Sequence, residues 1–197
     1  MSSLEDEYNV SSKRLDLEAL IIDWNKKSSV IRKTRPCKLD IKYGDYEEQK
    51  IDLFLAPVRN QPLLIYLHGG YWQRGNKNIY SFLAKPFTDA EINVATIGYG
   101  LSPLFSLRQI FENTQAAIMF LWNHSNDYYF NREEIHVMGH SAGGHLAAML
   151  MSTEWKCLQN DIPDNALKTS ILISFISELA PLKKTSINLN LSLTDQE

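Results

Sequence analysis

The sequence is poor in cysteine, has no strong excess of either charge and contains no long apolar run. Its two cysteines, Cys37 and Cys157, lie far apart and lack the C-x-x-C or metal-type spacing that marks redox and zinc sites. We expect free thiols in a reducing compartment, and therefore a cytoplasmic protein. The formal net charge is −3 and the 20 lysines and arginines are scattered, which argues against nucleic acid or an anionic membrane as a partner.

No apolar run approaches the ~20 residues that a membrane-spanning helix requires. Residues 1–12 are acidic and polar, unlike the basic and then apolar pattern of a signal peptide, and we expect them to be flexible. The composition, 44% hydrophobic and 22% charged, is that of an ordinary globular protein. The length of 197 residues suffices for one domain with a proper core, so residues 1–197 are interpreted as a single domain.

Apolar runs of strand length alternate with segments of helical periodicity along the chain. Strands are predicted at residues 39–43, 50–55, 63–67, 92–97, 135–138 and 170–176, and helices at residues 15–24, 79–90, 107–123 and 142–152. Pro86 is expected to interrupt the second of these helices. The runs at 63–67 and 92–97 are those of strands buried on both faces of a parallel sheet. The pattern predicts an α/β fold, with a mostly parallel sheet and helices on both faces.

One predicted strand ends in a motif that carries chemistry. The strand at 135–138 runs into Gly139-His140-Ser141-Ala142-Gly143, and a helical segment follows at once. A G-x-S-x-G sequence between a strand and a helix is typical of a nucleophile elbow, a strained turn that exposes one serine hydroxyl. Ser141 is therefore the candidate nucleophile, with the N–H of Ala142 directed at an oxyanion. The alternative is a serine that caps an ordinary helix.

A second glycine motif follows the buried strand at 63–67. It reads His68-Gly69-Gly70-Tyr71-Trp72. Two glycines after a buried strand let backbone N–H groups approach a ligand closely, as the second half of an oxyanion hole requires. A plain glycine turn is the alternative, but the presence of the Ser141 motif favours the functional interpretation.

With both motifs in place, the sequence resembles the arylformamidase (kynurenine formamidase) family of the α/β-hydrolase superfamily. Residues 68–72 match that family's HGGxW motif, and residues 139–145 match its GHSAGGH elbow. Asp52-Leu53-Phe54 with Pro57 matches its D-L-F-x-P segment, and residues 182–193 are similar to a later stretch. The resemblance covers the chain from about residue 40 onward.

The resemblance implies hydrolysis of N-formyl-L-kynurenine to L-kynurenine and formate, in tryptophan degradation. It implies an oxyanion hole formed by the N–H groups of Gly70, Tyr71 and Ala142, a small-molecule substrate, and neither a cofactor nor a metal. Tyr71 and Trp72 are candidates for the wall around the aromatic part of the substrate, with simple packing as the alternative. A carboxylesterase is the second interpretation, because an HGG oxyanion hole serves esters equally well.

The sequence does not supply a complete catalytic triad. In this fold the triad follows the order Ser, acid, His, yet His145 is the only histidine after Ser141, and it lies about one helical turn beyond the serine. His68 is expected to make an orienting hydrogen bond, and His136 to be packed in the core. Glu178 takes the place of a residue without a triad role in the family pattern, so the triad acid and base both stay unassigned.

The resemblance also implies strands beyond Glu197, so the domain is expected to lack its last strands. Two explanations stay open: a piece of a longer formamidase, which we favour, and a shortened, inactive paralogue that serves as a binding module. Phe175 stands where the family has glycine, which alters the expected backbone there. The oligomeric state is left open by the sequence.

Overall fold

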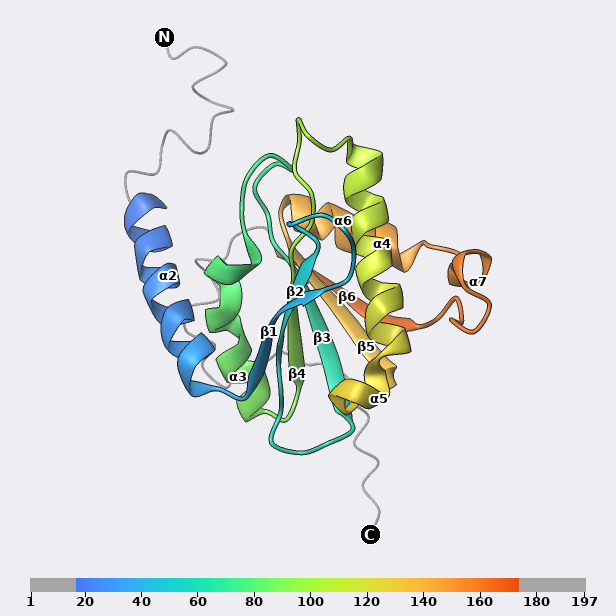
Figure 1. Cartoon of the computed structure of the whole chain (residues 1–197), viewed down its shortest axis with the longest axis horizontal. Helices are drawn as coiled ribbons and strands as arrows, with labels where there is room; N and C mark the ends of the chain where they lie inside the picture. The colour runs from blue at the N-terminus through green and yellow to red at the C-terminus, as the bar shows by residue number, and fades with distance from the viewer. Residues whose placement is uncertain (1–16, 174–197) are drawn as a thin grey trace.

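The computed structural model describes residues 17–173, which form a six-stranded sheet in the order β1-β2-β4-β3-β5-β6 (Figure 1). The strands are β1 (Cys37–Lys42), β2 (Lys50–Phe54), β3 (Gln61–Leu67), β4 (Asn93–Ile97), β5 (Phe130–His140) and β6 (Leu167–Ile173). The predictions for residues 1–12, Phe175, Glu178 and 182–193 lie outside the described residues.

The sheet is mixed, with its parallel part on the side that carries both glycine motifs. β1 pairs antiparallel with β2, and β2 pairs antiparallel with β4. From β4 onward the pairs β4–β3, β3–β5 and β5–β6 are parallel. The carboxyl ends of β3 and β5 therefore meet at one edge of the sheet, which brings residues 68–72 next to Ser141.

Helices cover both faces of the sheet, as predicted. They are α2 (Leu17–Thr34), the 3-10 helix η1 (Lys77–Leu83), α3 (Ala84–Asp89), α4 (Leu107–Asn123), α5 (Ser125–Tyr128), α6 (Ala142–Met151) and α7 (Trp155–Leu158). Figure 1 shows α2 and α3 on one side of the sheet and α4 on the other. The α/β fold inferred from the alternation of strands and helices is confirmed.

Several element boundaries differ from the sequence prediction. α4 begins and ends where predicted, and Ser106 and Gln109 close a capping box at its start. α2 continues ten residues past the predicted end at Trp24, to Thr34. The predicted helix at 79–90 is a 3-10 helix followed by α3, in which Pro86 occupies the first turn, where its missing N–H costs no hydrogen bond.

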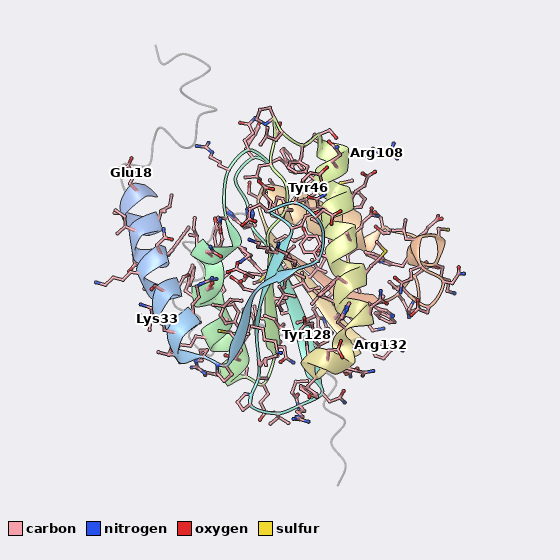
Figure 2. All side chains as sticks on the ribbon, viewed as in Figure 1. Glu18, Lys33, Tyr46, Arg108, Tyr128 and Arg132 are labelled. Carbon is pink, nitrogen blue, oxygen red and sulfur yellow. The ribbon has the colours of Figure 1, made fainter. Side chains whose placement is uncertain are left out.

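The main hydrophobic core lies between the sheet and the α4/α6 layer. Its fully buried side chains include Ile65, Ile118, Leu121, Trp122, Leu146 and Leu150. Figure 2 shows Tyr46 and Arg108 toward one end of α4 and Tyr128 and Arg132 toward the other. At the first end, the ring of Tyr46 contacts Phe105 edge-on, with centroids 5.0 Å apart. The core thus fixes α4 beside the carboxyl ends of β3 and β5, where the motifs lie.

Truncation of Ile118 to alanine is expected to lower the free energy of unfolding by about 2–5 kcal/mol, because it leaves a cavity in the main core. Ile118 is 1% exposed, whereas Ile22 on α2 is 68% exposed. The matched change Ile22→Ala should alter the unfolding free energy by less than about 0.5 kcal/mol. Urea unfolding of both variants measures the difference, and equal midpoints would contradict this placement of the core.

Candidate active site

Ser141 lies in a strained turn between β5 and α6. β5 ends at His140, α6 begins at Ala142, and Ser141 has φ 51° and ψ −116°. A non-glycine residue in this conformation costs about 1–3 kcal/mol and is kept only where its surroundings impose it. The serine is exposed, and Ala142 behind it is buried. This is the geometry that a nucleophile elbow requires.

Glycines at 139 and 143 allow this turn to be tight. A Cβ at Gly139 would lie 2.1 Å from the carbonyl oxygen of Gly143, and a Cβ at Gly143 would lie 2.1 Å from that of Leu67. Both distances are far inside van der Waals contact, so no side chain fits at either position. The two glycines therefore allow strand and helix to come into backbone contact.

The segment His68–Asn76, which we call the HGG loop, joins the end of β3 to η1. Gly70, Tyr71 and Trp72 all have positive φ, at 126°, 58° and 57°. Left-handed backbone at two consecutive aromatic residues is unfavourable by about 1–2 kcal/mol per residue. The HGG loop therefore holds strain next to the strained serine.

The HGG loop lies directly against the elbow. A Cβ on Gly69 would lie 2.6 Å from Nδ1 and 2.7 Å from the carbonyl oxygen of His140. The loop then folds back on itself, because the N–H groups of Gln73 and Arg74 both donate to the carbonyl of Gly70, at 3.1 and 3.0 Å. The structure thus brings the two glycine motifs together, because they follow the neighbouring strands β3 and β5.

His68 is a buried, neutral residue at the start of the HGG loop. Its ring stacks on Tyr99 with centroids 4.3 Å apart and an interplanar angle of 10°. Its Nδ1 lies 2.8 Å from the carbonyl oxygen of Gly69, and the hydroxyl of Tyr99 donates to the carbonyl of His68 itself. Burial lowers the pKa of His68 to about 4, against a smaller raising effect of the Gly69 carbonyl. The orienting role of His68 stays a prediction.

The two aromatic residues of the motif have different surroundings. Tyr71 is 69% exposed. Trp72 is half-buried against the main core, and its ring meets that of His145 edge-on, with centroids 5.4 Å apart. The N–H of Ser102 donates to the Trp72 carbonyl at 2.7 Å. Packing therefore explains Trp72, and Tyr71 is the side chain left open to a ligand.

Two of the remaining histidines, His145 and His136, contact other parts of the chain. His145 lies one turn into α6, where its backbone N–H donates to the carbonyl of Ser141 at 3.1 Å. His136 is half-buried rather than packed in the core, and its Nδ1 lies 2.6 Å from Oγ1 of Thr169.

Within residues 17–173, no group of three or more His, Cys, Asp or Glu side chains is arranged to hold a metal ion. In the same range, no helix combines the length and apolarity needed to cross a membrane.

Sequence reasoning missed a group of charged residues beneath the HGG loop, here named the ion cluster: Arg32, Asp40, Asp52 and Lys77. The carboxylate of Asp52 is fully buried and pairs with Nζ of Lys77 at 2.6 Å and with the guanidinium of Arg32. Lys77 also pairs with Asp40, at 2.7 Å. An aspartate inside the apolar strand at 50–55 was the available signal, since a buried carboxylate needs a cation.

Comparison with known proteins gives a family and several relatives. The BD-FAE family model matches residues 51–182. Kynurenine formamidase from Danio rerio is 32% identical over 160 residues, which cover 80% of this chain and 52% of that protein. Acetyl esterase from Salmonella typhi is 33% identical over 123 residues, covering 62% of this chain and 36% of that protein. The chain spans about half the length of the formamidase that it matches.

Solved structures share the fold. A protein from Silicibacter sp. tm1040 gives a TM-score of 0.74 at 23% identity, covering 91% of this chain and 67% of that chain. Esterase B from Lactobacillus rhamnosis gives a TM-score of 0.60 at 20% identity, covering 81% of this chain and 58% of that chain. At these identities the likeness shows the fold alone. The resemblance to formamidases is confirmed at the level of sequence similarity, while the roles of the site residues stay predictions.

Gly143→Ala is expected to destabilise the protein by about 1–3 kcal/mol or more, because the added methyl group overlaps the carbonyl oxygen of Leu67 and pushes α6 away from β3. Urea unfolding measures the loss. A variant with the wild-type midpoint would show that α6 does not need this close approach.

Acid is expected to destabilise the protein through His68. Its folded pKa of about 4 lies below the ordinary value of 6.5, so between these values the unfolded state binds more protons and stability falls as the pH falls. The slope reaches at most about 1.4 kcal/mol per pH unit. In His68→Gln the unfolding free energy should fall less steeply with falling pH. Part of the slope that remains comes from His136, because burial lowers its pKa too. Urea unfolding at intervals from pH 7 to 4 measures both slopes, and equal slopes would contradict the prediction.

Proposed function

The chain belongs to the BD-FAE family of α/β-hydrolases, and on that basis we propose that it is part of a serine hydrolase in which Ser141 is the nucleophile. The strained backbone of Ser141, at the tip of a parallel strand and against the HGG loop, is the observation that carries the proposal. A helix cap does not account for it, since the side chain of Ser141 makes no capping hydrogen bond to α6.

The proposed reaction is acyl transfer. Oγ of Ser141 attacks the substrate carbonyl carbon, the bond to the leaving nitrogen or oxygen breaks, and water then releases the acid from the acyl-enzyme. The N–H groups of Gly70, Tyr71 and Ala142 stabilise the oxyanion, each donor being worth roughly 3 kcal/mol in such sites. The base that takes the serine proton is left unassigned.

We further propose an aryl formamide, N-formyl-L-kynurenine, as the substrate, with L-kynurenine and formate as products. The similarity to kynurenine formamidase from Danio rerio over 80% of the chain supports this choice. The exposed ring of Tyr71 beside the elbow is a suitable surface for the substrate's aromatic ring. The similarity to acetyl esterase from Salmonella typhi supports a small ester as the second candidate.

Ser141→Ala is expected to abolish labelling by a fluorophosphonate probe and hydrolysis of an aryl formamide, because both need the serine oxygen. Ser152→Ala, an exposed serine at the other end of α6, is the matched control and should label as the wild type does. Intact-mass analysis of the labelled proteins and formate release measure the two effects. Failure of the pure protein to hydrolyse any formamide or ester would refute the proposal for this chain.

A comparison of N-formyl-L-kynurenine with 4-nitrophenyl acetate decides between the two substrate classes. The formamidase proposal expects the higher kcat/KM for the formamide, because recognition of the aryl group adds to oxyanion stabilisation. A higher value for the acetate would favour the carboxylesterase.

A further inference from the structure

The ion cluster lies where the HGG loop ends, and its lysine is the first residue after the loop. Lys77 follows Asn76 directly and begins η1, so its backbone continues from the downstream end of the loop. Its side chain is only 6% exposed although it carries a charge. A buried ammonium group is stable only where carboxylates and hydrogen bonds replace its lost water.

Lys77 pairs with carboxylates on two strands and with the side chain of its neighbour in η1. Nζ of Lys77 donates to the fully buried carboxylate of Asp52 on β2 at 2.6 Å and to that of Asp40 on β1 at 2.7 Å. It also donates to the side-chain oxygen of Asn78 at 2.9 Å. Asp52 also accepts the backbone N–H of Asp40 at 2.8 Å, and the guanidinium of Arg32 on α2 pairs with it. Asp52 lies in register with Thr96 on β4, in the interior of the sheet. One buried carboxylate therefore ties the end of the loop to the sheet.

The other end of the loop is held by Tyr99 and by the downstream part of the loop itself. The Tyr99 hydroxyl donates to the carbonyl of His68, and Gly75 lies so close to the loop's start that a Cβ there would be 2.5 Å from the Gly69 carbonyl oxygen. Gly70 and Tyr71 lie between these fixed ends and have positive φ angles. If either end were freed, the backbone at Tyr71 would move to a less strained conformation. The loop's shape thus depends on both anchors.

We propose that Lys77, held by Asp52, is a positioning residue that sets the HGG loop in the shape that aims the N–H groups of Gly70 and Tyr71 at the oxyanion. The inference rests on the proposed hydrolase function. The side chain of Lys77 acts on the reaction through the backbone of the loop and does not touch the substrate.

The test compares Lys77→Met with Lys85→Met, the same change at an exposed lysine of α3 that pairs with Asp89 at 2.6 Å. Two readouts are used: hydrogen exchange of the backbone amides of residues 69–76, and steady-state hydrolysis. Lys77→Met should speed amide exchange in the loop at least about tenfold and lower kcat roughly 10- to 100-fold, with KM changed less than about twofold. Lys85→Met should match the wild type in both.

Wild-type exchange and kcat in a folded Lys77→Met would overturn the proposal, and so would a change in KM alone. If the wild type itself hydrolyses nothing, the proposed function fails, and the exchange measurement still decides whether Lys77 anchors the loop. Should Lys77→Met not fold, Asp40→Asn removes a half-exposed partner of Lys77 and keeps the buried pair. Its loop amides should exchange about two- to fivefold faster, and an unchanged rate would overturn the inference.

Discussion

The contact between the backbones of α6 and β3 is the constraint on which the candidate site depends. At Gly143 the helix approaches the carbonyl oxygen of Leu67 so closely that a methyl group has no room. This approach forces the chain between β5 and α6 into a single turn, and that turn leaves Ser141 in a backbone conformation that it would not adopt alone. The strain at the serine is maintained by the packing of the two elements beside it, each of which is anchored in the main core.

Much of the fold could be predicted from the sequence, because local patterns carry it. α4 begins and ends as predicted, since its apolar face repeats at helical spacing and Ser106 caps it. α2 continues past its predicted end because the polar run at 25–29 hides the helical period. β5 starts at Phe130, before the predicted 135, because Phe130 pairs with Gln61 of β3 and the polar residues 131–134 form a register irregularity that has no apolar pattern.

The parts of the candidate site that depend on the backbone shape of a short motif could be predicted. The parts that depend on contacts between side chains far apart in the sequence could not. The glycines around Ser141 revealed the elbow because glycine is needed where backbones touch. The contact of Tyr99 with His68 was not foreseen, because it joins the ends of two strands 31 positions apart in the chain. The pairing of Asp52 with Lys77 was missed for the same reason, although a carboxylate inside an apolar strand indicated that some cation would be near.

The ion cluster has a consequence for the behaviour of the protein on heating. Removing charges from water is costly near room temperature, so a buried group of this kind adds little net stability there. The hydration of ions becomes less favourable as temperature rises, and the cost of burying Asp52 and Lys77 falls accordingly. The link between β2 and the end of the HGG loop therefore weakens less on warming than links made by exposed ion pairs.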